Sequence, residues 1–340
     1  KKKLLSLLLP GATVLSLDAC GQQTVTTNPP ASNPPASPSQ SQPTAAVKHT
    51  EPTGHPAIRT NTAPENDFYD TSLNNNATNY KLYDLIHGYV TVTSDMEGEW
   101  VFDPTVVASH EEVENEDGTK TYTVTINEGL VWSDGTPITA KNYVFQLLLE
   151  SSPEMNTVDG YPSQAGYPLV GYQDYFDGKT DKFAGVHLVD DMTYSVTVRA
   201  DELPYHYDIT YASAAPRPMH VIAPDCDVVD TPEGAMITGD FTSELLMETI
   251  NNPTTGYRYN PTVTCGPYLF AGFDEAAQEA TLTVNPNYMG DYRGVKPVIE
   301  TLVVRTVSSD TMMNELQAGS VDLLYESSGA DTINAGLDLV

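Results

Sequence analysis

The stretch TYTVTINEGLVWSDGTPITAKNYVFQLLL, residues 121–149, changes its hydrophobic period from two to about four, and this change constrains the fold more than any other feature. Its first part alternates apolar and polar residues, which is typical of a half-buried strand. Asp134 and Gly135 predict a tight turn, because Asp can bond its own backbone and Gly accepts a positive φ. Thr139 is a suitable N-cap for an amphipathic helix over Ala140 to about Glu150. A strand, a turn and a helix in close succession indicate the α/β or α+β class.

Other segments continue this mixture of strands and helices. An antiparallel hairpin is predicted over residues 106–127, with its turn at 116–118. Helices are predicted over residues 80–90 and 308–319, the second ending at a glycine. Residues 151–181, rich in Gly, Pro and Tyr, are predicted to be loop. Further strands are predicted in GVHLVDDMTYSVTV, CGPYLF, EATLTV, ETLVVRTV and VDLLY.

The N-terminal region has the composition of a targeting segment followed by a tether. Three lysines precede an apolar run of about 14 residues, which is too short for a typical membrane-spanning helix. The sequence LDAC resembles the bacterial lipobox, so we expect residues 1–20 to be a lipoprotein signal peptide with lipid on Cys20, in preference to plain secretion. Residues 21–55 are rich in Pro, Ser and Thr and lack apolar periodicity, which predicts a disordered tether.

Charge and motif content exclude several classes of function. The formal net charge is -30 with only 16 Lys and Arg, so we expect no nucleic-acid partner. The sequence contains no GxSxG, HExxH, GxGxxG or P-loop motif, and we predict no enzyme activity and no cofactor. Acidic residues cluster at 111–117, but they lack the spacing of a calcium loop, so a solvated hairpin is favoured over a metal site.

Two cysteines remain once Cys20 is assigned to lipid. An extracellular setting permits a disulfide between Cys226 and Cys265, and two buried free thiols are the alternative. Sequence spacing does not decide between them, because the bond depends on the separation of the two Cα atoms.

Five segments in order resemble a known family. They are TYTVTINEGLVWSDGTPITAKNYVF, FAGVHLVDDMTYSVTV, CGPYLF, NPNYMGDYRGVKPVIETLVVRTV and DTMMNELQAGSVDLL. Together they are similar to the family 5 extracellular solute-binding proteins of ABC importers, which include oligopeptide- and dipeptide-binding proteins. The resemblance extends from about Thr60 to the last residue. Asn127 stands where the family commonly has a basic residue, and Cys265 where it has a small one.

The resemblance implies the two-lobed α/β fold of type II periplasmic binding proteins, often called a Venus flytrap. Lobe I would comprise residues 56–89 and 200–318, with an extra subdomain at 90–199. Residues 319–340 would begin lobe II, most of which would be missing. We therefore expect a truncated chain that binds peptide weakly or not at all by itself.

The resemblance also implies a function and a set of site residues. The protein would be a monomer at the extracellular face of the bacterial cell membrane or in the periplasm. It would hold a lipid anchor, capture oligopeptides and deliver them to ABC permease subunits. Asp134, Gly135, Gly266 and Pro267 would form structural turns. The expected groove residues, for which ordinary packing or surface roles are the alternative, are Tyr69, Asn74, Tyr161 and Tyr259.

Two other functions stay open at this point. A surface lipoprotein of this kind could act as a receptor or adhesion protein without transport. Alternatively, the importer could carry a nickel chelate or a sugar in place of a peptide.

Overall fold

The computed structural model describes residues 57–60, 62–69, 73–158, 165–291, 293–325 and 329–337. The predicted signal peptide with Cys20, the tether and Tyr161 therefore lie outside the described residues. Within these ranges, no helix combines the length and apolar character needed to span a membrane.

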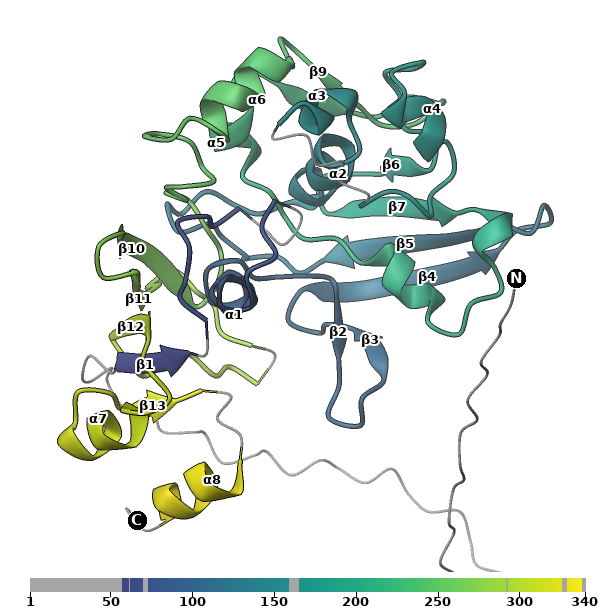
Figure 1. Ribbon diagram of the computed structural model, residues 1–340. Coiled ribbons are helices and arrows are strands. Elements are labelled where there is room, and N and C mark those ends of the chain that lie inside the picture. Colours follow the sequence, from purple (N-terminus) through teal and green to yellow (C-terminus); the bar gives the residue numbers. More distant parts are fainter. Residues whose placement is uncertain are drawn as a thin grey trace, which may run out of the picture. The chain divides into compact units, whose positions relative to one another are not determined.

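A five-stranded mixed sheet brings together segments from both ends of the described chain (Figure 1). Strand β1 (Ala57–Thr60) lies next to one edge of this sheet and runs parallel to β12 (Thr301–Thr306) on one side and to the edge strand β13 (Leu323–Leu324) on the other. Beyond β12, the strands β11 (Glu279–Val284) and β10 (Tyr268–Asp274) continue the sheet in antiparallel order. The predicted strands in these segments are confirmed.

Helix α1 (Ala77–Ile86) packs its apolar side against this sheet. Asn76 caps the helix by accepting hydrogen bonds from two backbone amides, which are otherwise unpaired at a helix start. The helix ends at Ile86, four residues earlier than predicted. Tyr89 lies beyond it with a φ of 57°, so the prediction that the helix extends over Tyr89 to residue 90 is wrong.

A second, four-stranded antiparallel sheet has the order β4-β5-β7-β6. It contains the predicted hairpin of β4 (Val107–Glu114) and β5 (Lys120–Ile126), followed by β7 (Thr193–Val198) and β6 (Val186–Leu188). The alternation read from the sequence is confirmed, because every second residue of β5 and β7 is buried. The buried side chains are Tyr122, Val124, Ile126, Tyr194, Val196 and Val198.

Helix α2 (Ala140–Leu149) follows the turn at Asp134 and Gly135 and covers one face of the four-stranded sheet. Thr139 is its N-cap, as predicted, and forms a capping box with Asn142. The helix is not amphipathic in its surroundings, because only Lys141 escapes burial. Elements from later in the chain cover its outer side, and a helix enclosed on all sides is apolar all round.

The remaining elements are short. They comprise β2 (Val92–Ser94), β3 (Trp100–Phe102), α3 (Pro153–Asn156), α4 (Tyr172–Phe176), η1 (Ala200–Glu202), η2 (Asp208–Ala212), α5 (Met219–Ile222), β8 (Asp227–Val229), β9 (Met236–Thr238), α6 (Ser243–Thr249), α7 (Met312–Ala318) and α8 (Ala330–Leu337).

Helices α3 and α4 correct the prediction that residues 151–181 are loop. Single-turn helices leave little periodicity in a sequence, so the sequence pattern did not indicate them.

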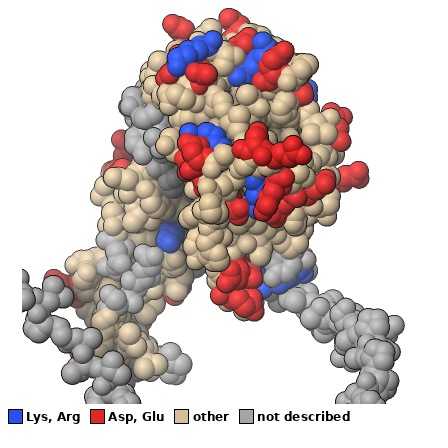
Figure 2. Space-filling view, turned by 90° about the vertical axis from the view of Figure 1, so that its right-hand side faces the viewer, with Lys and Arg blue, Asp and Glu red and all other residues tan. Residues whose placement is uncertain are grey.

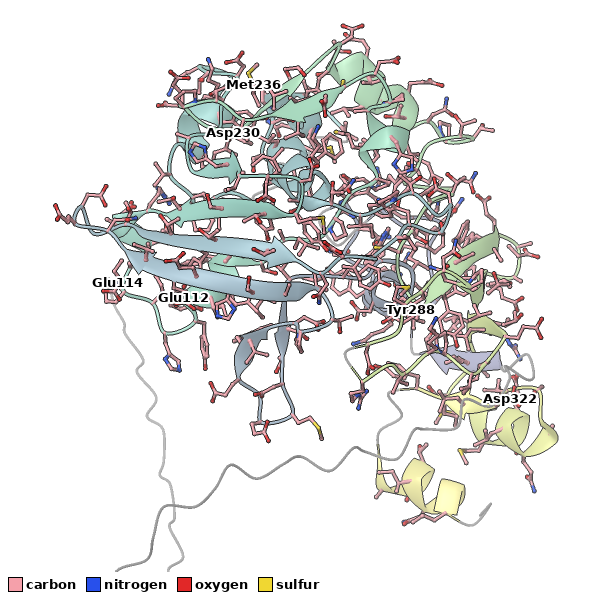
Figure 3. The ribbon with its side chains drawn as sticks, turned by 180° about the vertical axis from the view of Figure 1, so that it is seen from behind. Glu112, Glu114, Asp230, Met236, Tyr288 and Asp322 are labelled. Atoms are coloured by element: carbon pink, nitrogen blue, oxygen red, sulfur yellow. The ribbon has the colours of Figure 1, made fainter. Side chains whose placement is uncertain are left out.

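Two large hydrophobic cores accompany the two sheets. One lies between α1 and the five-stranded sheet. The other contains the four-stranded sheet, α2 and many residues between 212 and 265. Tyr288 lies between the two sheets and stacks on Tyr89, with ring centroids 5.6 Å apart (Figure 3). The proposed domain boundaries at residues 89 and 199 remain a prediction, and residues 212–265 share their core with the proposed subdomain.

The two cores meet where the chain after α1 passes the segment before β10. Gly266 donates its amide to the carbonyl of Ile86 at 2.9 Å. A Cβ on Gly266 would lie 2.5 Å from the carbonyl oxygen of Leu85, so only glycine fits this crossing.

We predict that Gly266→Ala lowers the free energy of unfolding by about 1 to 3 kcal/mol, because the new methyl group meets rigid backbone. Urea unfolding followed by circular dichroism measures the change. Gly336→Ala in α8 is the control, since its Cβ meets nothing within 4 Å. Equal stability of the Gly266→Ala variant and the wild type would contradict the close crossing.

Candidate functional site

The segment before α1 is fixed by a buried arginine from the loop that follows α6. The guanidinium of Arg258 donates to Asp67 Oδ2 through Nε at 2.7 Å and Nη2 at 2.6 Å. Its Nη1 donates to Asn251 Oδ1 at 3.0 Å, and its Nη2 to the carbonyl of Leu73 at 3.3 Å. The amide of Phe68 donates to the carbonyl of Arg258 at 2.6 Å. These contacts attach Asp67, Phe68 and Leu73 to a loop between 185 and 191 positions later in the chain.

A second buried arginine, Arg217, contacts Tyr69 of the same segment. Arg217 donates to Glu150 Oε1 through Nε at 2.7 Å and Nη2 at 2.6 Å. Its Nη1 lies 3.4 Å from the carbonyl oxygen of Tyr69, and its guanidinium lies 4.5 Å from the centre of the Tyr69 ring. Gln146 donates to the other carboxylate oxygen of Glu150 at 2.5 Å.

Burial and hydrogen bonding determine what these charges can do. The side chains of Arg217 and Glu150 are each 6% exposed, and those of Arg258 and Asp67 are 10% and 8% exposed. Charges in such surroundings are tolerated only when they are paired and hydrogen-bonded. Both carboxylates are engaged by guanidinium groups, so their role is to hold backbone in place, and acid-base chemistry is not supported.

The structure gathers three of the predicted groove residues around these arginines. The Tyr69 side chain is fully buried and packs edge-on against Tyr257, with centroids 6.3 Å apart, so the prediction that it lines a groove is corrected to a packing role. Asn74 is partly exposed, and its Oδ1 accepts the amide of Asn76 at 2.7 Å. Tyr259 is also partly exposed and donates to Asn251 Oδ1 at 3.3 Å. Groove roles for Asn74 and Tyr259 remain predictions.

The turn residues have contacts that hold segments together. Asp134 accepts the amide of Thr136 at 2.9 Å, and its second oxygen lies 2.9 Å from Nε2 of His220 on α5. Together with the amide of Thr136, His220 lowers the pKa of the Asp134 carboxyl, against the opposing effect of burial. Gly135 has a φ of 86°, the left-handed region that Gly adopts without strain.

Pro267 follows the crossing at Gly266. The carbonyls of Gly266 and Pro267 each accept a hydrogen bond from Asn285, through its side chain and its backbone amide, at 2.9 Å. The proposed structural roles of Gly266 and Pro267 rest on these contacts.

Sequence reasoning missed Arg217, Arg258 and Glu150. A weak signal was present, because Glu150 ends the apolar run LLLE and a charge at that position of a buried helix requires a partner. The partner itself is invisible in sequence, since Arg217 is 67 residues away.

Of the two alternatives that the sequence left open for Cys226 and Cys265, the structure has the free thiols and not the disulfide. Cys265 is buried beside the crossing at Gly266, and its Sγ lies 3.4 Å from the carbonyl oxygen of Gly88. Cys226 is partly buried after α5. Within the part of the chain that the structure describes, no group of three His, Cys, Asp or Glu side chains is placed to hold a metal ion.

Comparison with known proteins assigns the family. Residues 103–337 match the family described as bacterial extracellular solute-binding proteins, family 5 Middle. This match covers more than half of the chain, and the protein therefore belongs to family 5 of the bacterial extracellular solute-binding proteins. That family consists of solute-binding proteins and not of enzymes.

Two curated relatives show the range of solutes in the family. The periplasmic oligopeptide-binding protein OppA of Salmonella typhimurium is 27% identical over 64% of this chain and 34% of its own length. The probable deoxycholate-binding periplasmic protein YgiS of Escherichia coli is 30% identical over 71% of this chain and 38% of its own length. The chain thus spans well under two thirds of these relatives.

The fold agrees with solved structures of the family. The oligopeptide-binding protein AppA of Bacillus subtilis, in complex with a nonapeptide, superposes with a TM-score of 0.55 at 14% identity. The superposition covers 80% of this chain and 44% of AppA. This likeness confirms the predicted α/β fold of the two-lobed type II binding proteins, of which the chain covers less than half.

We predict that Arg258→Met lowers the free energy of unfolding by about 3 to 5 kcal/mol, because it leaves the buried Asp67 carboxylate without its guanidinium. Adding Asp67→Asn should cost less than the sum of the two single changes, since the uncompensated charge is removed.

Chemical denaturation of the two single variants and the double variant measures this coupling. Arg293→Met is the matched control, because Arg293 forms a comparable ion pair with Asp291 but its side chain is 59% exposed. The control should lose less than about 1 kcal/mol. Additive losses for Asp67 and Arg258 would show that the pair does not act as a unit.

Cys226 and Cys265 should differ in their rates of reaction with a thiol-labelling reagent. Burial raises the pKa of Cys265 to about 12, and it also raises the pKa of Cys226. At pH 8 we expect Cys226 to react slowly with iodoacetamide and Cys265 to react only after unfolding, because the thiolate is the reactive form. Peptide mass spectrometry assigns the label. Equal labelling of both residues in the native protein would contradict the burial of Cys265.

Proposed function

We propose that this protein is the substrate-binding lipoprotein of an ABC importer, which captures extracellular oligopeptides and delivers them to a membrane permease. Membership in family 5 is the observation that supports a role in import. The peptide specificity is supported by the OppA relative and by the fold shared with peptide-bound AppA.

In this proposal a peptide lies extended between two lobes and is bound mainly through its backbone, as when a strand is added to a sheet edge. Backbone recognition requires that the protein groups do not move when they are desolvated. The buried arginines meet that requirement at Tyr69 and Leu73, because they bind the backbone carbonyls of these two residues. Asn74 and Tyr259, which are partly exposed beside it, are the described residues that we assign to the peptide side.

A deoxycholate-like solute is the second candidate, because YgiS aligns with a larger share of the chain than OppA does. Electrostatics favours peptide over this candidate. Deoxycholate is an anion, and a chain with a net charge of -30 repels anions at long range. A peptide without charged side chains has no net charge and is not repelled, and peptides with basic side chains are attracted by the same field.

Lipidation at Cys20 would keep the protein at the outer face of the membrane, where the permease lies. The proposal includes the tether at residues 21–55 as the spacer between the lipid and the folded part. A monomer suffices for this role, because each solute-binding protein presents one liganded molecule to the permease.

We expect the complete gene product to bind a pool of tri- to pentapeptides with a dissociation constant in the micromolar range, about -8 kcal/mol. Isothermal titration calorimetry with the peptide pool, a lysine-rich peptide and deoxycholate distinguishes the candidates. Saturable binding of peptides alone supports the proposal, and binding of deoxycholate alone replaces it with the second candidate.

The same titration with residues 1–340 measures how much of the affinity this chain supplies. A variant with Asn74→Ala is compared with Asn314→Ala, a change of the same type at an exposed position of α7. Loss of affinity in the first variant only would support the assignment of Asn74. A protein that binds no solute of either class would overturn the importer role.

A further inference from the structure

A cavity of about 220 Å³ opens among α3, α4 and the chain from β9 to α6. In Figure 1 these elements lie together above the four-stranded sheet. The cavity is smaller than the sites of about 300 to 1,000 Å³ that hold drug-sized ligands, so a ligand here has few atoms. None of the described residues that line it is a Lys or an Arg. Its apolar wall is formed by Pro153, Ile237 and Phe241.

A buried tyrosine without a hydrogen-bond partner also lines the cavity. The side chain of Tyr175 on α4 is only 5% exposed, and its ring stacks on Phe183 with centroids 5.1 Å apart. Among the described residues, none accepts or donates a hydrogen bond at the Tyr175 hydroxyl. Leaving a buried hydroxyl unpaired is costly, so a polar ligand atom in the cavity would be a favourable partner for it.

Two carboxylates line the cavity near this hydroxyl. Burial raises the pKa of Tyr175, and the charges of Glu154 and Asp181 raise it further, so both carboxylates lie within electrostatic range of the hydroxyl. Glu154 is half-buried, and its carboxylate has no ion pair or hydrogen bond with any residue that the structure describes. Asp181 is exposed and lies 3.5 Å from Nζ of Lys182, which is longer than the roughly 2.7 to 2.9 Å of a charge-assisted hydrogen bond.

The other lysine of this region is already engaged by carboxylates outside the cavity. Nζ of Lys179 lies 3.1 Å from Asp174 Oδ1 and 2.9 Å from Asp177 Oδ2. Figure 2 views the molecule from the side on which α4 lies in Figure 1, and at its upper end Lys and Arg side chains stand beside Asp and Glu side chains. Lys179 therefore does not neutralise the two carboxylates that line the cavity, and these carboxylates favour a cation.

We propose that this cavity binds a small primary alkylammonium ion. An ammonium group has three N–H donors, and the cavity offers three acceptors in Glu154, Asp181 and the Tyr175 hydroxyl. Hydrogen bonds from an ammonium to carboxylates are charge-assisted and strong. The alkyl chain packs against the apolar wall. The cavity shares no lining residue with the arginine-anchored segment at 67–73, so the inference does not depend on the proposed peptide site.

The test is a titration of the purified protein with butylammonium chloride at pH 7, followed by ligand-observed NMR. The matched ligands are butan-1-ol, which lacks the charge, and butyltrimethylammonium, which keeps the charge but has no N–H donor. We expect butylammonium to bind about ten-fold more tightly than the alcohol and about five-fold more tightly than the quaternary ion. Equal affinity for butylammonium and the quaternary ion, or no saturable signal, would overturn the proposal.

A lysine side chain carries the same chemical group as a free alkylamine. Nα-acetyl-lysine methylamide is therefore titrated in parallel. Tighter binding of butylammonium supports a free amine as the ligand, and tighter binding of the lysine derivative supports a lysine side chain.

Variants locate the binding. Glu154→Gln should weaken butylammonium about five-fold, and Tyr175→Phe, which keeps the ring that stacks on Phe183, about three-fold. Glu244→Gln is the matched control, because Glu244 is the second residue of α6 as Glu154 is of α3, but it does not line the cavity. Thermal unfolding confirms that each variant is folded. Unchanged affinity in Glu154→Gln would place the ion elsewhere and contradict the site.

Discussion

The ion pairs formed by Arg258 with Asp67 and by Arg217 with Glu150 help to connect the two hydrophobic cores, which the two large sheets alone would leave separate. The five-stranded sheet and the four-stranded sheet have different cores, and the neighbouring residues Phe68 and Tyr69 belong one to each core. Arg258 binds this segment from the loop after α6, and Arg217 binds it from the side of α2. Desolvation makes such pairs costly to form, and their loss is costlier still, because a single unpaired charge would remain buried.

This anchoring explains why the segment suits a solute-binding protein. A binding lobe that recognises backbone must present its own polar groups in fixed positions, since ordering them on binding would reduce affinity. The close crossing at Gly88 and Gly266 adds a second constraint, because carbonyls and Cα atoms there approach each other without side chains between them. Tyr89, with its positive φ and its contacts to Tyr143 and Met289, lies directly after that crossing.

Acidic charge affects this protein at two distances. At long range, a net charge of -30 repels anions and attracts cations, which favours solutes with basic groups. At short range, carboxylates near the β4–β5 turn form ion pairs with Lys120 and Arg199.

The sequence by itself determined the local elements and the family. Alternation in TYTVTIN and SVTV specified β5 and β7, and Thr139 and Gly319 marked the start of α2 and the end of α7, because these signals depend on neighbours within a few residues. Only the tertiary structure decided that α2 is enclosed on all sides, that Tyr69 is buried, that Cys226 and Cys265 remain unpaired, and that Arg217 and Arg258 anchor the candidate site. Each of these outcomes depends on contacts between residues far apart in the chain, and a sequence read along its length does not record which distant side chains meet.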